Sequence, residues 1–343
     1  MDDGRATGVL ATVTPRGGGK VTSLTVLSRA VVVSGGAIHT PAILLRSGLK
    51  HPLIGRHLRL HPVLLVGGVF PEDYRRGDSA EGVAGDSGPI SKLSLFSSAY
   101  KGEGGGVMTG KGVSDSFLTP RSPDFGRGVM MGVYLQDWMG LNGGYGAVIE
   151  TPPMHPGLMG LCMPWNDALS HRLTVAMARE MSVFLCIGRD RSSADNRILL
   201  GPQGDPVVKY TLEKEDGQVL VRARSEMLRL MRKAGASLLV PAHEGAPWFC
   251  PQDGRAGDEG LEEYIEAIEE MGTTTNQAGV FSAHQMGSCR LSATREGGPL
   301  RESGETWECN GLFVADASVF PTSLGINPMI TVEAVAYMVA EQV

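Results

Sequence analysis

Alternating runs of apolar and polar residues open the chain and predict a βα unit. Residues 6–13 and 21–27 are rich in apolar side chains and flank a glycine-rich turn at 16–20, which predicts a β-hairpin. Residues 30–33 read Ala-Val-Val-Val, a run typical of a strand buried on both faces. Thr40-Pro41 then opens an apolar run, which predicts a short helix with proline at its first position.

The middle of the chain mixes strands with two amphipathic helices. Apolar runs predict strands at 63–66, 129–135, 147–150, 177–188 and 207–211. Spacing of three and four between apolar positions predicts helices over 220–234 and 261–271. The glycine-rich stretch 77–112 contains Gly105-x4-Gly110-Lys111, part of a P-loop pattern. Gly112 follows where that pattern needs Ser or Thr, so we interpret the stretch as a mobile loop.

The last sixty residues predict a strand and a helix, each next to a polar loop. Residues 311–318 predict a buried strand, and Asn327-Pro328 predicts a helix with asparagine as the N-cap and proline at its first position. We expect five apolar side chains to line that helix: Ile330, Val332, Val335, Met338 and Val339. The whole pattern indicates the α/β class, with α+β features in its middle part.

Composition narrows the functional classes. The 343 residues are 42% hydrophobic and 20% charged, which is ordinary for a globular protein with a buried core. The net charge of −6 gives no electrostatic reason to expect nucleic acid as a partner. The five cysteines show no C-x-x-C spacing, so we expect reduced thiols. No apolar run is long enough to span a membrane, and residues 1–5 lack the apolar core of a signal peptide.

Histidines supply the candidate chemistry. His57 and His61 are four apart, but no acidic residue stands at the required place between them and Pro62 follows, so we reject a metal site and expect hydrogen-bonded or solvated loop imidazoles. His284 lies in a polar, glycine-containing loop, 43 residues before Asn327. The first turn of the helix after Asn327 offers free N–H groups and partial positive charge, which suit the anionic edge of a reduced flavin.

Several segments read as motifs, among them His284-Gln285-Met286-Gly287-Ser288-Cys289-Arg290, Gly325-Ile326-Asn327-Pro328-Met329-Ile330-Thr331 and the residues 36–49, 149–152, 188–191 and 311–321. Together they resemble the motifs of the glucose-methanol-choline (GMC) oxidoreductases, FAD enzymes that oxidise alcohols, and most closely those of the long-chain fatty alcohol oxidase branch. Residues 36–49 match the family's second signature, and the chain departs from it at Lys50, where the family has Gly. The strand–GxGxxG–helix unit with which the family opens does not occur, so we expect this chain to be the C-terminal part of such an enzyme and to bind FAD weakly or not at all by itself.

The resemblance implies a role for each matching residue. His284 would be the catalytic histidine, which takes the hydroxyl proton or holds the alkoxide as hydride leaves for flavin N5. Asn327 would hydrogen-bond the substrate oxygen. Asp316 and Ala317 resemble the residues beside the FAD pyrophosphate and ribityl chain. Asn327, Pro328 and Met329 resemble those under the flavin N1–C2 edge.

The resemblance also implies an organisation and a reaction. We expect an incomplete Rossmann-like FAD-binding domain in 1–60, a substrate domain built on an antiparallel sheet in 61–280, and a return to the FAD domain in 281–343. The expected reaction oxidises a long-chain primary alcohol with oxygen as acceptor. Alternatives are a dehydrogenase with another acceptor, a fatty-acid photodecarboxylase and a non-catalytic remnant. Relatives of this branch are often membrane-associated, so peripheral membrane association stays open, as does the oligomeric state.

Overall fold

The computed structural model describes residues 4–70 and 134–343, apart from 137, 138, 153, 180, 192, 251–259 and 275. These residues form two units. The first unit takes residues 1–61, 189–213 and 282–343, and the second takes 62–188 and 214–281. Residues 189–213, which the sequence analysis places in the middle segment, thus lie in the first unit.

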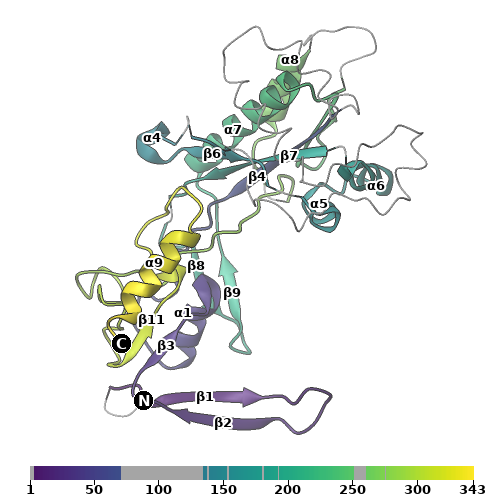
Figure 1. The fold of residues 1–343 in the computed structure, drawn as a ribbon. Coiled ribbons are helices and arrows are strands. Elements are labelled where there is room, and N and C mark those ends of the chain that lie inside the picture. Colours follow the sequence, from purple (N-terminus) through teal and green to yellow (C-terminus); the bar gives the residue numbers. More distant parts are fainter. Residues whose placement is uncertain are drawn as a thin grey trace, which may run out of the picture. The chain divides into compact units, whose positions relative to one another are not determined.

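The first unit is built around a short parallel sheet and two helices (Figure 1). Strand β3 (Val31–Val33) pairs in parallel with β11 (Leu312–Val314), and the chain after β3 enters α1 (Gly36–Arg46). The same unit holds two antiparallel hairpins, the short turn η5 and the C-terminal helix. Their bounds are β1 (Gly8–Val13) with β2 (Thr22–Leu27), β8 (Arg197–Leu200) with β9 (Pro206–Lys209), η5 (Ala317–Val319) and α9 (Met329–Ala340). The predicted hairpin, strand and helix at the start of the chain are confirmed.

Helix α1 begins earlier than predicted and keeps a proline in its interior. It starts at Gly36, so Pro41 lies inside the helix and not at its first position. Proline has no N–H, and the carbonyl four residues earlier therefore loses its helical partner. Here that carbonyl belongs to Ala37, and the buried hydroxyl of Ser288 donates to it at 2.6 Å. The proline is tolerated because a loop distant in sequence replaces the missing hydrogen bond.

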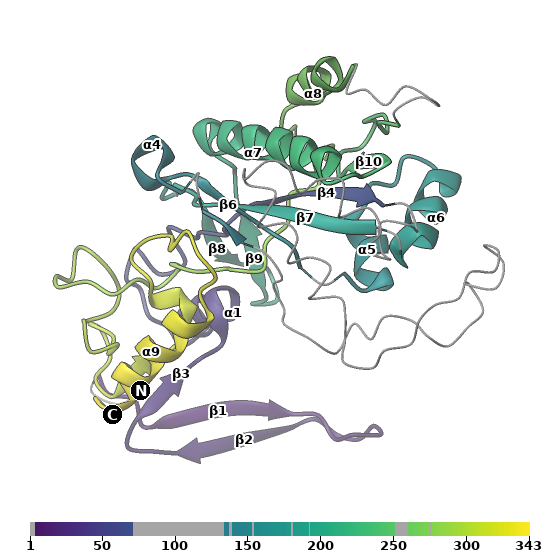
Figure 2. The same ribbon diagram turned by 45° about the horizontal axis from the view of Figure 1, so that its top comes forward.

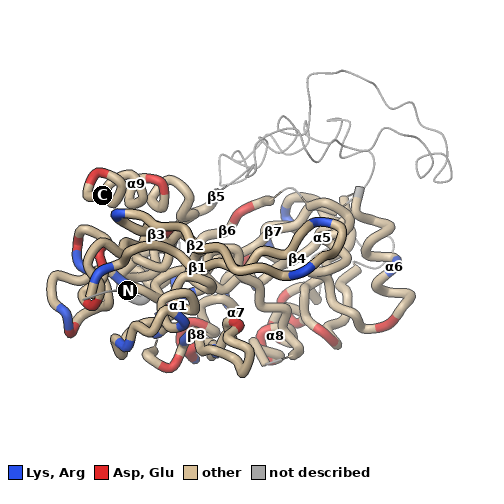
Figure 3. Tube along the Cα trace, turned by 90° about the horizontal axis from the view of Figure 1, so that it is seen from below, with Lys and Arg blue, Asp and Glu red and all other residues tan. Residues whose placement is uncertain are grey.

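Two elements of the first unit expose apolar side chains. Neither β1 nor β2 contains a Lys, Arg, Asp or Glu, so both strands are tan in Figure 3, and Leu10 and Leu27 are 75% and 80% exposed. In α9 only Val339 is buried, whereas Ile330 is 70% exposed. Of the five apolar side chains expected to line this helix, Ile330 thus faces outward, because the helix packs only one narrow side against the unit.

The second unit is a five-stranded antiparallel sheet with helices (Figure 2). Its strand order is β10-β4-β7-β6-β5, and the helix α7 lies along β4, β6 and β7. The strands are β4 (Val63–Val69), β5 (Tyr134–Leu135), β6 (Ala147–Glu150), β7 (Met181–Gly188) and β10 (Leu238–Pro241). The helices are α4 (Leu141–Gly144), α5 (Pro156–Cys162), α6 (Ala168–Ala176), the 3-10 turn η4 (Met177–Arg179), α7 (Lys214–Lys233) and α8 (Leu261–Glu270).

The mixed α/β class with an antiparallel second sheet is confirmed. The strand predicted over 311–318 is shorter and ends at Val314, because the Asp316 carboxylate accepts from the Ser318 N–H at 2.7 Å and closes the turn η5. The glycine-rich stretch 77–112 and the first part of the strand predicted at 129–135 lie outside the described residues. Within the described part of the chain, every helix is too short or too polar to cross a bilayer.

Candidate functional site

An antiparallel pairing places two histidines opposite each other in the first unit. Arg59 and Met286 exchange both backbone hydrogen bonds, each 2.9 Å long, and the Ser282 hydroxyl donates to the Leu60 carbonyl. Residues 59–61 therefore run beside 282–286. The Nδ1 atoms of His61 and His284 lie 3.3 Å apart, and the two rings meet edge to face with centroids 5.4 Å apart.

Both imidazoles sit where a positive charge is costly. Burial, together with the smaller effects of the nearby His284 and Arg189, lowers the pKa of His61 to about 3. Burial also lowers the pKa of His284. Because desolvation disfavours the charged form, both rings are neutral near pH 7.

The loop that leads to Asn327 reaches the same ring. The Gly325 N–H donates to His61 Nε2 at 2.9 Å, so the two loops that the sequence singled out bind the two nitrogens of one imidazole. Gly325 has φ +77°, and a Cβ there would come within 3.0 Å of the Arg189 Cδ. Only glycine fits this turn without strain.

A buried carboxylate fixes the backbone around His61. Asp190 is fully buried and accepts from the backbone N–H groups of Leu60 and His61 at 2.9 and 3.3 Å. It also accepts from the hydroxyls of Tyr210 and Ser323, both at 2.9 Å. One carboxylate thus holds the segment of His61 and the start of the Gly325 loop in a fixed relation.

The sequence analysis missed His61 and Asp190. It interpreted His61 as an ordinary loop histidine, because hydrogen-bonded imidazoles are common in loops. Asp190 lies in the segment 188–191 that matches the family, but no role followed from the match. One signal was present: His61-Pro62 lies in the loop directly before the apolar run of β4, and functional residues are often found on loops that a rigid scaffold positions.

Asp316 and Ala317 lie at the start of η5, next to α1. One carboxylate oxygen of Asp316 accepts from the Gly36 N–H at 3.0 Å and from the Thr40 hydroxyl at 2.5 Å, and the other accepts from Ser318. The Ala317 carbonyl accepts from the Gly287 N–H at 3.1 Å. The Asp316 side chain is therefore engaged in holding α1 and η5, which leaves main-chain groups as the means by which this segment would contact a cofactor.

The beginning of α9 differs from the prediction by one residue. Pro328 is the N-cap and Met329 the first helical residue, so the prediction of Asn327 as the N-cap is wrong. Proline has no N–H to lose and its φ of −86° suits the position before the helix. No side chain caps α9 and no acidic residue lies in its first turn. Its first N–H groups therefore keep the partial positive charge that favours an anion.

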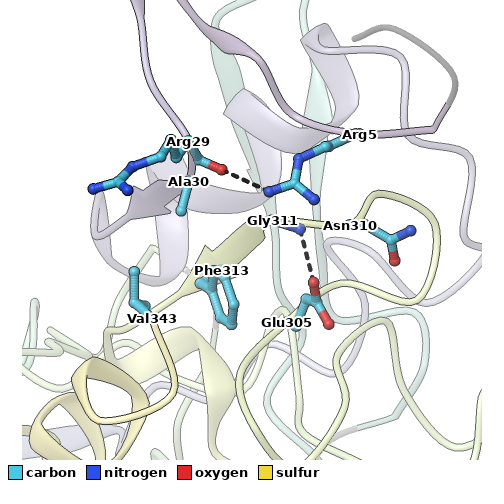
Figure 4. A pocket seen from close by; sticks show the side chains of 8 residues that line it. All are labelled: Arg5, Arg29, Ala30, Glu305, Asn310, Gly311, Phe313 and Val343. Atoms are coloured by element: carbon cyan, nitrogen blue, oxygen red, sulfur yellow. Dashed lines mark hydrogen bonds between the residues drawn. The ribbon is translucent and has the colours of Figure 1, made fainter.

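A pocket elsewhere in the first unit contains none of these residues (Figure 4). Its volume is about 600 Å³, and it lies at the beginning of β3 and β11, where Arg5, Arg29 and Glu305 line it. The Arg5 guanidinium donates to the Arg29 carbonyl at 3.2 Å, and Glu305 accepts from the Gly311 N–H at 2.7 Å. The side chains of Arg5 and Glu305 thus hydrogen-bond nearby backbone atoms. The candidate site remains the one around His61 and His284.

Comparison with known proteins identifies the family. Two GMC oxidoreductase models match the chain, one at residues 1–63 and the other at 192–336. The chain belongs to the GMC oxidoreductases. His284, Asn327, Asp316 and His61 all lie within the matched ranges. FAD, the predicted cofactor, is confirmed as the cofactor of the family.

Individual relatives are similar to the chain in sequence, and a solved structure is similar to it in fold. The long-chain-alcohol oxidases FAO4A and FAO3 of Arabidopsis thaliana are 30% and 29% identical to the chain over 91% and 93% of its length. The chain spans 36% and 37% of those two proteins. A formate oxidase from Aspergillus oryzae has the same fold, with a TM-score of 0.56 and 17% identity over 99% of this chain and 57% of the oxidase.

Proposed function

We propose that this GMC chain carries the catalytic end of a FAD-dependent alcohol oxidase, which converts a long-chain primary alcohol to its aldehyde with oxygen as the electron acceptor. The observation that carries the proposal is the meeting of the His284 loop and the Asn327 loop on the two nitrogens of His61. The names of the Arabidopsis relatives support the alcohol and its chain length. A small-molecule alcohol and oxygen are accordingly the proposed partners.

The residues present fit FAD. The uncapped first turn of α9, with Pro328 and Met329 at its start, offers N–H groups and partial positive charge to the N1–C2 edge of a flavin. The main chain of Asp316 and Ala317 would hold the pyrophosphate and ribityl part. Bound FAD supplies the acceptor for the hydride that leaves the carbinol carbon.

His284 and Asn327 would act on the substrate oxygen. A neutral His284 can take the hydroxyl proton or donate a hydrogen bond to the oxygen, and its lowered pKa keeps it neutral. The Asn327 amide would orient the same oxygen without adding charge, which suits an apolar alcohol.

The test uses the flavin-loaded protein with a long-chain primary alcohol and measures aldehyde and hydrogen peroxide. We expect both products in equal amounts, and we expect His284→Ala to lower kcat by about 10²- to 10⁴-fold, the usual range for a lost acid–base group. His39→Ala, on α1, is the matched control and should keep the wild-type rate. A His284→Ala rate within a few-fold of wild type would remove His284 from the mechanism.

Two other outcomes identify the alternatives. Aldehyde formed only with an added electron acceptor, and no peroxide, would indicate a dehydrogenase. Hydrocarbon formed from a fatty acid under blue light would indicate a photodecarboxylase. Either result would overturn the oxidase assignment while leaving the family unchanged.

A further inference from the structure

His61 is the residue on which the two predicted loops meet, and its own role has not been assigned. It is fully buried and adopts a left-handed backbone with φ +47°. A non-glycine residue in this region is strained, and such strain persists only where the surroundings hold it. The Asp190 carboxylate supplies that hold through the N–H groups of Leu60 and His61.

The hydrogen bond from Gly325 determines which nitrogen of the His61 ring carries the proton. A backbone N–H can only donate, so His61 Nε2, 2.9 Å away, must be the unprotonated nitrogen. A neutral imidazole carries one proton, which is therefore on Nδ1. Burial keeps this ring neutral, since it lowers the pKa of His61 to about 3.

The His61 proton in turn decides the proton on His284. His61 Nδ1–H points at His284 Nδ1 across 3.3 Å, so His284 Nδ1 is the acceptor. The proton of a neutral His284 then has to be on Nε2. In an imidazole ring the two nitrogens point in divergent directions, so this N–H is directed away from His61.

We propose that His61 is a positioning residue that fixes His284 in the Nε2-protonated tautomer through the directed chain Gly325 N–H to His61 to His284. The inference rests on the proposed function in one respect: the oxygen that His284 contacts is taken to be that of the alcohol. In this tautomer His284 of the resting protein presents an N–H to that oxygen and holds it by a donated hydrogen bond.

The opposite tautomer is incompatible with the same contacts. With the proton on His284 Nδ1, two N–H groups would face each other, unless the His61 proton moved to Nε2. The His61 proton on Nε2 would then face the Gly325 N–H, whose direction is set by a turn that only glycine fits. The chain of donors therefore runs one way.

Nitrogen NMR of the ¹⁵N-histidine-labelled 343-residue chain, without flavin or substrate, tests the tautomer directly. His284→Gln assigns the His284 signals by their disappearance. We expect a protonated Nε2 and an unprotonated Nδ1 for His284 at pH 7. His61→Phe keeps a ring but removes both nitrogens, and we expect it to give His284 signals averaged between the two tautomers. His57→Phe, four residues earlier and also left-handed, should retain the wild-type pattern.

Each outcome decides the proposal. A wild-type His284 with its proton on Nδ1 would overturn it, and this result needs no variant to fold. An unchanged Nε2 tautomer in a folded His61→Phe protein would show that His61 only fills space. These signals are read without flavin or alcohol. The tautomer proposal can therefore be overturned while the alcohol oxidase proposal stands, and the alcohol oxidase proposal can be overturned while the tautomer proposal stands.

Discussion

Two regions of the molecule, the β4–α7 layer of the second unit and the cluster around Asp190 in the first unit, are held by different kinds of contact. In the second unit, all seven residues of β4 are buried, and α7 covers the sheet with fully buried apolar side chains such as Leu220 and Met227. In the first unit, three fully buried polar residues, His61, Asp190 and Ser323, are joined by hydrogen bonds. Apolar contacts carry no direction, whereas each hydrogen bond specifies a donor and an acceptor.

The two kinds of contact have different consequences for the protein. Apolar packing sets the free energy of unfolding, whereas the polar network also sets the orientation of the His284 ring. A sheet packed by apolar contacts tolerates a change that conserves volume, because its energy depends on area and packing. A buried polar network costs stability when one partner is lost, and it also loses its geometry. Substitutions among the apolar residues of β4 and α7 should therefore change the free energy of unfolding alone. Substitutions around Asp190 should change that energy and the His284 ring together.

The largest effect is expected in helix α7, which covers the sheet of the second unit. Met227→Ala removes a fully buried side chain under the sheet and should lower the free energy of unfolding by about 2–5 kcal/mol. Met227→Leu, which nearly conserves volume, should cost less than about 1.5 kcal/mol. Urea unfolding measures both. A changed His284 tautomer in the folded Met227→Ala protein would contradict the claim that apolar substitutions here affect stability alone.

Asp190→Asn tests the polar network. The amide keeps one accepting oxygen but turns an N–H₂ group toward two of the four donors, so we expect a loss of about 2–4 kcal/mol in the free energy of unfolding. His284 should also lose its fixed tautomer. Asp195→Asn, at an exposed neighbouring position, should change neither. Full stability and an unchanged His284 signal in Asp190→Asn would show that the carboxylate is not needed.

Acid should destabilise the fold through His61. Its pKa is about 3 in the folded protein and about 6.5 in an unfolded chain, so below pH 6.5 the unfolded state binds a proton that the folded state does not. Stability is complete above pH 6.5 and falls as the pH drops toward 3. At pH 5 the loss amounts to about 2 kcal/mol. Urea unfolding at pH 7 and pH 5 should show a loss larger by this amount in wild type than in His61→Phe, because the contribution of His284, whose pKa is also lowered, remains in both proteins. Equal losses in both proteins would contradict the buried, neutral His61.

The smallest effect is expected at the proline of α1. Ser288→Ala removes the donor for the Ala37 carbonyl, which Pro41 cannot supply, and should cost about 1–2 kcal/mol of the free energy of unfolding. Ser47 makes a similar bond to the Ile43 carbonyl at an exposed position, so Ser47→Ala should cost less than about 0.5 kcal/mol. Equal costs at the two sites would mean that the buried carbonyl finds another donor.

Local patterns predicted the elements that local forces form. The hairpin around 16–20, the strand at Val31–Val33 and the helix predicted over 220–234 follow from periodicity, and the structure confirms them, although α7 begins earlier, at Lys214. The predicted start of α1 was wrong because the Ser288 hydroxyl, 251 residues away, compensates for the N–H that Pro41 lacks. Sequence spacing contains no signal for such a partner.

The candidate site was predictable only in part. Its family motifs indicated His284 and Asn327, whose catalytic roles stay predictions. The part played by His61 depends on a contact with His284 across 223 residues and on the Gly325 N–H. Neither a histidine in a loop nor a glycine in a turn carries such information alone. Residues 189–213 joined the first unit for the same reason, since Asp190 binds residues that are distant in sequence.

Anaerobic reduction of the flavin tests the central proposal most directly. The flavin-loaded protein is mixed with a long-chain primary alcohol without oxygen, and the absorbance of the oxidised flavin is followed. The proposed function predicts bleaching with one aldehyde formed per flavin, slowed several-fold when the carbinol hydrogens are replaced by deuterium, and far slower in His284→Ala. A protein that retains its flavin but is not bleached by primary alcohols of any chain length would contradict alcohol oxidation at this site.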